Sequence, residues 1–214
     1  EDVILEIAKR LDAGQTTHDL RDMRGVAYLL GKKDQLPAHE GETVALPSLE
    51  EVKADKVEFA KMTRTLHNET NPFNGRRITQ MHGDRTLVIN PAVLPMEDGE
   101  MDALYNLPYT RRAHPSYDAP IPAYEMIKDS ITIMRGCFGG CTFCSITMHQ
   151  GRTIQNRSEE SILKEAHQIA EAPDFKGTIS DLGGPTANMY RMRCTKPEVE
   201  AVCRRLSCIH PKVC

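Results

Sequence analysis

Apolar residues recur at helical spacing, every three to four positions, in three stretches at residues 3–11, 49–66 and 162–170. Ser48 and Glu51 form a capping box before the second stretch, and Ser158 stands in the N-cap position before the third. Such spacing places the apolar side chains on one face of a helix. The pattern therefore predicts three amphipathic helices, each with one face packed on a protein core.

Short runs of apolar, mostly β-branched residues predict buried strands. These runs lie at residues 25–30, 86–90, 131–135 and 177–182. Residues 32–47 and 108–123 are polar or proline-rich and predict linkers. The order strand, helix, strand after residue 130 predicts a βαβ unit with parallel strands. The fold class is therefore α/β, with a domain boundary between residues 123 and 124.

Composition narrows the classes of protein. The chain has 214 residues with 27 basic and 30 acidic side chains, and a net charge of −3 gives no electrostatic reason to bind nucleic acid. No apolar run approaches the ~20 residues of a membrane span, and the first residues do not resemble a signal peptide. Seven cysteines are an odd number for a disulfide framework, so metal chemistry in a reducing cytoplasm is the better expectation.

The first cysteine group directly follows the predicted strand at 131–135. Cys137, Cys141 and Cys144 have the spacing C-x3-C-x2-C. Three thiolates can hold three irons of a [4Fe–4S] cluster and leave the fourth iron open, as catalytic metal sites require. Glycines around the thiols allow the backbone to wrap closely. The spacing favours a cluster; the alternatives are a zinc site and buried or disulfide-bonded cysteines.

The second cysteine group lies at the end of the sequence. Cys194, Cys203, Cys208 and Cys214 have the spacing C-x8-C-x4-C-x5-C. A capping box at residues 195–198 predicts a helix that carries Cys203 on its apolar face, where a thiol can simply pack in the core. Our hypothesis is an auxiliary iron–sulfur cluster or a structural zinc, with unliganded thiols as the alternative.

Four segments together point to a known family. They are Ile133-Met-Arg-Gly-Cys-Phe-Gly-Gly-Cys-Thr-Phe-Cys-Ser-Ile-Thr147, Ser180-Asp-Leu-Gly-Gly-Pro-Thr-Ala-Asn-Met-Tyr190, His67-Asn-Glu-Thr-Asn71 and Ile121-Pro-Ala-Tyr-Glu-Met126. These segments, which include aromatic Phe143 before the last cysteine of the triplet, resemble the YgiQ family of radical S-adenosylmethionine (radical SAM) proteins. Met148 and Gln150 depart from residues that are more often acidic in the family, which leaves the cysteine triplet intact.

The resemblance implies an architecture. Residues 124–214 would begin a partial (β/α)6 barrel whose first strand precedes the cysteine loop, and residues 1–123 would be a mixed α/β N-terminal region that starts with the tail of a Rossmann-like region. Only 77 residues follow Cys137, which is room for about two βα units at ~30 residues each. We therefore expect a piece of a longer protein, truncated at both ends and unable to complete a reaction alone.

The resemblance also implies a chemistry. The [4Fe–4S] cluster on Cys137, Cys141 and Cys144 would bind S-adenosylmethionine through the amine and carboxylate of its methionyl group. One electron from a donor protein or reagent would then cleave the cofactor and give a 5′-deoxyadenosyl radical, which abstracts hydrogen from a substrate. The substrate cannot be identified from this sequence.

Some residues are expected at the cofactor because their positions match those of the family. Gly183 and Gly184 match a glycine-rich turn whose backbone contacts the cofactor amine, Asp181 would add a carboxylate, and the backbone beside Phe143 would face the adenine. Pro185 replaces a residue that is commonly acidic. An ordinary tight turn at 183–185 and simple core packing of Phe143 are the alternatives.

Three basic residues follow the triplet, namely Arg152, Arg157 and His149. Either arginine could meet the carboxylate of the cofactor, and a solvated surface position is the alternative. Three classes of protein remain: a radical SAM enzyme, a non-catalytic iron–sulfur protein that carries electrons or senses redox state, and a zinc-stabilised interaction module. Binding of the cofactor separates the first two classes, and metal content separates both from the third.

Overall fold

The computed structural model describes residues 2–185 and 187–214. The chain forms two compact units. The first contains the residues up to Leu94 together with Thr195–Cys208, and the second contains Pro95–Cys194 together with Ile209–Cys214. These units are distinct from the family regions that the sequence predicts, so the boundary between residues 123 and 124 stays a prediction.

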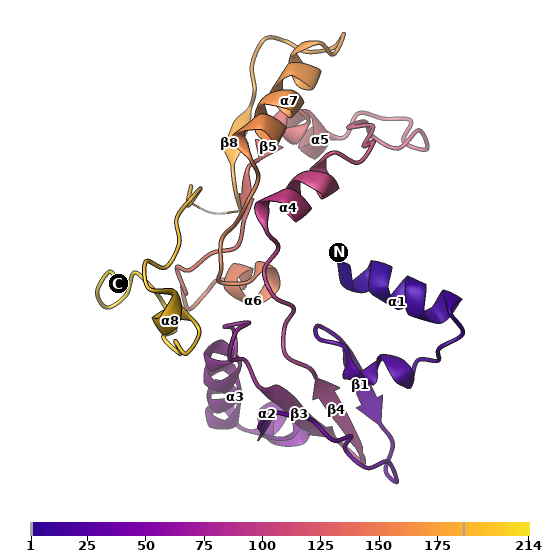
Figure 1. Cartoon of the computed structure of the whole chain (residues 1–214), viewed down its shortest axis with the longest axis vertical. Helices are drawn as coiled ribbons and strands as arrows, with labels where there is room; N and C mark the ends of the chain where they lie inside the picture. Colours follow the sequence, from indigo (N-terminus) through magenta and orange to yellow (C-terminus); the bar gives the residue numbers. More distant parts are fainter. Residues whose placement is uncertain (1, 186) are drawn as a thin grey trace. The chain divides into compact units, whose positions relative to one another are not determined.

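The first unit is built on a four-stranded mixed sheet (Figure 1). Its strands are β1 (Ala27–Leu30), β2 (Thr43–Ala45), β3 (Arg77–His82) and β4 (Arg85–Ile89), in the order β1-β4-β3-β2. β4 is antiparallel to both of its neighbours, whereas β2 and β3 are parallel. The sequence did not predict β2, a strand of three residues inside the expected linker at 32–47, or β3, in which only Ile78 and Met81 are apolar.

The helices of the first unit are α1 (Asp2–Asp12), the 3-10 turn η1 (Asp19–Asp22), α2 (Leu49–Ala54), α3 (Lys56–Asn68) and α8 (Pro197–Glu200). The single helix predicted across 49–66 is two helices. Asp55 leaves the helical region with φ −130° and ψ 121°, and its side chain accepts a hydrogen bond from the N–H of Val57. One residue thus ends α2 and caps α3, which the apolar spacing alone does not reveal.

The second unit contains α4 (Asp98–Tyr105), α5 (Pro122–Ile127), β5 (Ser130–Thr132), β6 (Met134–Arg135), α6 (Ile146–Gln150), β7 (Gln155–Asn156), α7 (Glu159–Ala170) and β8 (Asp181–Gly183). β5 and β8 are parallel, with Ile131 opposite Leu182, and β6 and β7 are antiparallel. The parallel pair on either side of α7 confirms the predicted βαβ unit. The fold is mixed α/β; the partial barrel stays a prediction for a longer chain.

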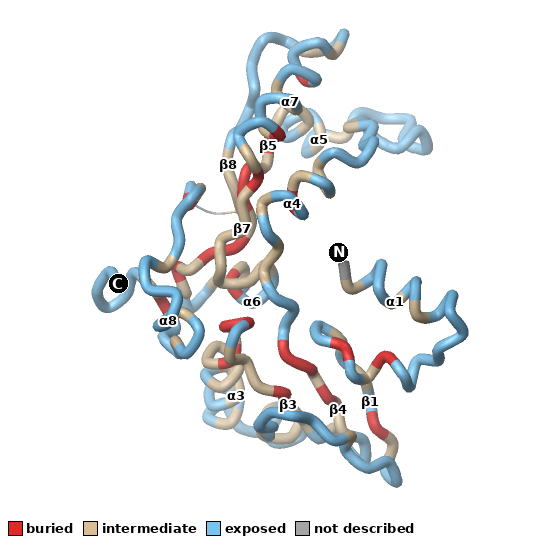
Figure 2. Tube along the Cα trace, in the orientation of Figure 1, coloured by how far each residue is buried: buried red, intermediate tan, exposed pale blue. Residues whose placement is uncertain are grey.

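Burial in the second unit differs from the sequence prediction at one strand. Ile131 is 1% exposed and Met134 0% exposed, whereas Leu182 in β8 is 54% exposed. Figure 2 colours the chain by burial and shows buried positions at β5. Among the residues that the structure describes, β5 is the strand that pairs with β8, and the other edge of β8 has no partner strand there. The run at 177–182, which predicts a buried strand, is therefore an exposed edge that becomes strand only from Asp181 onward. None of the described helices is both long and apolar enough to cross a membrane.

Candidate cluster-binding site

The cysteine loop begins directly after β6 at Gly136, a position that has no room for a side chain. Gly136 has φ +96°, and a Cβ atom built on it would lie 2.3 Å from the carbonyl oxygen of Thr153. Both the positive φ and this close approach exclude residues with a side chain. The passage from strand to loop is thus fixed by a backbone contact with the segment that follows α6.

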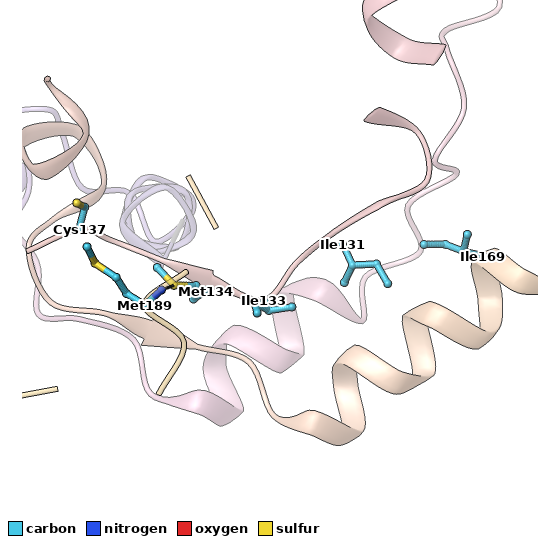
Figure 3. Packing of buried hydrophobic residues seen from close by; sticks show 6 residues of the cluster. All are labelled: Ile131, Ile133, Met134, Cys137, Ile169 and Met189. Atoms are coloured by element: carbon cyan, nitrogen blue, oxygen red, sulfur yellow. Dashed lines mark hydrogen bonds between the residues drawn. The ribbon is translucent and has the colours of Figure 1, made fainter. Parts of the chain in front are cut away.

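Cys137 is held at the start of the loop by its backbone. Its N–H donates to the carbonyl of Gly151 at 3.0 Å, and its carbonyl accepts from the Thr147 hydroxyl at 2.9 Å. The residue is 7% exposed and belongs to the core cluster that also contains Met134 and Met189 (Figure 3). Cys137 is therefore anchored in the core while the loop after it turns outward.

Replacing Thr147 by valine should lower the stability of this anchor. The change keeps the shape but leaves the Cys137 carbonyl without its side-chain donor, which should cost about 1–3 kcal/mol of unfolding free energy. Urea denaturation of Thr147→Val measures the loss, and Thr147→Ser, which keeps the hydroxyl, is the matched control. Equal midpoints for the two variants would show that this hydrogen bond contributes nothing.

Two thiols flank Gly139. The N–H of Gly139 donates to Cys137 Sγ at 3.4 Å, and a Cβ atom on Gly139 would lie 3.3 Å from Cys137 Sγ and 3.9 Å from Cys141 Sγ. The N–H of Cys144 donates to the carbonyl of Cys141 at 3.1 Å, which closes the turn between them. Cys141 is exposed and Cys144 half-buried, and none of the three is in a disulfide. The disulfide-bonded alternative is therefore wrong.

The donor set suits an iron–sulfur cluster. Within residues 2–185 and 187–214, no three histidine, cysteine or acidic side chains converge closely enough to hold one metal ion. A [4Fe–4S] cluster takes each thiolate on a different iron, so its ligands need not converge on a single point. Hydrogen bonds from backbone N–H groups to sulfur, as at Gly139, tune the potential of such clusters. Three thiols on one glycine-rich loop fit this group.

The turn after β8 lies beside the strand that leads into the loop. A Cβ atom on Gly184 would lie 2.8 Å from Met134 Cγ and 3.2 Å from the Met134 carbonyl oxygen. The carbonyl of Gly183 accepts a hydrogen bond from the N–H of Ile133 at 2.8 Å. The structure thus brings the glycine pair against β6, as expected for the carboxyl ends of parallel strands.

Two other predicted site residues point to solvent. Asp181 is exposed, and its carboxylate oxygens lie 3.5 and 3.8 Å from the Cβ position of Gly183. Phe143 is 92% exposed, so the alternative in which its ring packs in the core is wrong. Both residues are accessible to a ligand, and their roles stay predictions.

Arg157 contradicts both expectations for the arginines. It is 1% exposed, and its guanidinium forms an ion pair with Glu165, donates to the Thr132 carbonyl at 2.9 Å and donates to Ser161 Oγ. The guanidinium carbon also lies 4.2 Å from the centre of the Tyr105 ring. Arg157 therefore links β5, α7 and α4, and its charge is paired with Glu165 inside the second unit. His149 is exposed on α6.

The second cysteine group is divided. Cys203 and Cys208 belong to the first compact unit, whereas Cys194 and Cys214 belong to the second. The helix predicted from the capping box is a single turn, α8, that ends at Glu200, so Cys203 lies in the irregular segment after it. The auxiliary iron–sulfur cluster or structural zinc at these four cysteines therefore stays a hypothesis.

Sequence reasoning missed the residues that support the loop. Thr147 and Met134 carry no pattern that separates them from ordinary helix and strand residues, because their roles depend on contacts between segments. The N–H of Met189 donates to the sulfur of Met134 at 3.2 Å (Figure 3). Only Gly136 gave a signal, since a glycine directly before the first cysteine indicates a restricted backbone.

Comparison with known proteins shows the class to which the chain belongs. Residues 1–130 match the family model described as Radical SAM N-terminal, which places the chain in the radical SAM class. The chain is 53% identical to UPF0313 protein blr7973 of Bradyrhizobium diazoefficiens over 100% of its own length and 34% of the relative. It is 44% identical to UPF0313 protein YgiQ of Escherichia coli K12 over 99% of its length and 36% of the relative.

The chain belongs to the YgiQ (UPF0313) family of radical SAM proteins, as its four characteristic segments predict. UPF0313 protein RPA0679 of Rhodopseudomonas palustris is 50% identical over 100% of the chain and 34% of the relative. The chain thus spans about a third of the length of these relatives. No solved structure matches the chain.

Proposed function

We propose that this chain supplies the N-terminal region and the first part of the catalytic core of a radical SAM enzyme. Cys137, Cys141 and Cys144 would hold a [4Fe–4S] cluster, and S-adenosylmethionine would bind beside it. The observation that carries this proposal is the placement of two thiols on either side of Gly139, in a loop that begins at the carboxyl end of β6.

Each group of residues has a separate part in this proposal. The backbone carbonyls of Gly183 and Gly184 would accept hydrogen bonds from the amine of the cofactor, Asp181 would supply a carboxylate, and the exposed segment at Phe143 would cover the adenine. When bound, the cluster supplies one-electron reductive cleavage of S-adenosylmethionine to methionine and a 5′-deoxyadenosyl radical. The protein positions and shields these groups.

The proposal also implies an electron donor, a reducing compartment and a longer protein. The cluster needs a one-electron donor, and its thiolates need a reducing compartment such as the cytoplasm. Substrate selection would depend on later parts of the barrel. Because the chain spans 34–36% of the relatives, we expect cluster and cofactor binding here and the complete reaction only in a longer protein.

Iron content tests the cluster assignment. Anaerobic reconstitution of the chain should give about four irons per molecule, and Cys137→Ala, Cys141→Ala and Cys144→Ala should each lose most of this iron because one iron loses its thiolate. Ser145→Ala, a change in the same loop that removes no thiol, is the control and should keep the iron. Full iron in all three cysteine variants would overturn the proposal.

A further inference from the structure

The segment at residues 67–76 contains one of the family's characteristic motifs, and the proposed chemistry does not use it. Two of its polar residues are nevertheless buried: the side chain of Glu69 is 2% exposed, and Asn71 is 1% exposed. Buried polar groups cost free energy unless they are hydrogen-bonded. The hydrogen-bond partners of Glu69 and Asn71 therefore show which other part of the chain this segment binds.

Glu69 is the charged centre of the segment. Its carboxylate accepts hydrogen bonds from the Arg76 backbone N–H at 2.9 Å, from Arg76 Nε at 3.0 Å and from Arg204 Nη1 at 3.0 and 3.1 Å. Burial by itself raises the pKa of Glu69, but the hydrogen bonds from Arg76 and Arg204 outweigh it and hold this pKa below its ordinary value. Glu69 is thus a carboxylate held between two arginines, one of them 135 positions later in the chain.

Two asparagines bind the carbonyl end of α8. Asn71 Nδ2 donates to the carbonyls of Glu200 at 2.7 Å and Cys203 at 2.9 Å. Asn74 Nδ2 donates to the carbonyls of Ala201 at 3.0 Å and Cys203 at 3.3 Å. Asn71 thus bonds to the carbonyl of the last residue of α8, and both amides bond to carbonyls of the irregular segment that follows it.

The loop that presents these amides is tightly closed. Asn71 Oδ1 accepts from the N–H of Phe73 at 3.1 Å, and the N–H of Gly75 donates to the Asn71 carbonyl at 2.7 Å. A Cβ atom on Gly75 would lie 2.9 Å from the carbonyl oxygen of Glu69 and 3.0 Å from that of Asn71. The hydrogen bonds that close this loop are therefore made among its own residues.

We propose that residues 69–76 are a docking site for residues 200–204 of the same chain, and that they set the conformation around Cys203. Every contact in this argument lies within the first compact unit. The N-terminal region would then position part of the second cysteine group, in addition to preceding the catalytic core. The inference is independent of the proposed cluster, because none of its contacts involves the first cysteine group.

The rate at which iodoacetamide alkylates Cys203 tests this inference in the full chain under reducing conditions. Asn71→Ala removes both bonds to the backbone at Glu200 and Cys203, so local opening should raise the Cys203 rate about tenfold or more. Peptide mass spectrometry gives the rate at each cysteine. Asn68→Ala, a change outside the docking site, is the control and should leave the rate unchanged.

Arg204→Met repeats the test from the docked segment and leaves the loop at 69–76 intact. It should raise the Cys203 rate while the rate at buried Cys137, in the second unit, stays the same. An unchanged Cys203 rate in Arg204→Met would overturn the inference. So would equal acceleration at Cys203 and Cys137, because that result reports general unfolding instead of undocking.

Discussion

Arg157→Met is expected to lower the unfolding free energy by about 3 kcal/mol, at the lower end of the range for breaking a buried ion pair. The side chain is 1% exposed and pairs with Glu165, which is 12% exposed and also pairs with Arg111. Methionine fills a similar volume but leaves the Thr132 carbonyl and the Ser161 hydroxyl without their donor. In the variant, Arg111 still pairs with the Glu165 carboxylate. The loss of unfolding free energy therefore stays at the lower end of the range.

Urea denaturation of wild type and Arg157→Met measures this loss. The matched control is Arg112→Met, because Arg112 is exposed and its replacement should change the free energy by no more than about 0.5 kcal/mol. Two variants with equal losses would show that Arg157 is not the link between β5 and α7 that its contacts indicate.

Gly136→Ala is expected to cost about 3 kcal/mol or more and to prevent iron binding. A positive φ alone strains a residue with a side chain by about 1–3 kcal/mol, and the new Cβ would also lie 2.3 Å from the Thr153 carbonyl oxygen. The overlap is with a backbone atom, so relieving it would shift the backbone at position 136, directly before Cys137. The loop should therefore lose the arrangement of its thiols.

Gly151→Ala is the matched control for this second variant. Gly151 also has a positive φ, +87°, but nothing lies within 4 Å of its Cβ position. It should show the strain of the backbone without the overlap, and it should retain the iron. Denaturation midpoints and iron content of the two variants separate the effects, and identical results for both would refute the role of the Thr153 contact.

The sequence was informative where the chemistry is local. Three cysteines in eight residues, with glycine before the first, predict the loop, and the apolar run at 131–135 predicts the strand that leads into it. The alternation of strand and helix also predicts the parallel pair of β5 and β8, which the register confirms. Each of these signals depends on residues close together in the chain.

The sequence failed where burial and long-range contacts decide. From sequence alone, a charged residue such as Arg157 is expected on the surface. Its contacts with Glu165 and with the Tyr105 ring are visible only in the folded structure. The motif at 67–71 indicated the family but not its partner, since residues 200–204 lie far along the chain. Spacing in sequence also does not show that Cys194 and Cys203 belong to different compact units, and the metal site predicted for them stays a hypothesis.

The central claim is an iron at this loop that is open to S-adenosylmethionine. The most direct measurement is EPR of the anaerobically reconstituted and reduced protein, with and without S-adenosylmethionine, on wild type and Cys141→Ala. The account predicts a cluster signal in wild type that changes when the cofactor is added, and its loss in Cys141→Ala. The result that would contradict this account is a cluster signal that stays unchanged when the cofactor is added, both in this chain and in full-length YgiQ of Escherichia coli. Such a result would point to an electron carrier whose cluster has no open iron.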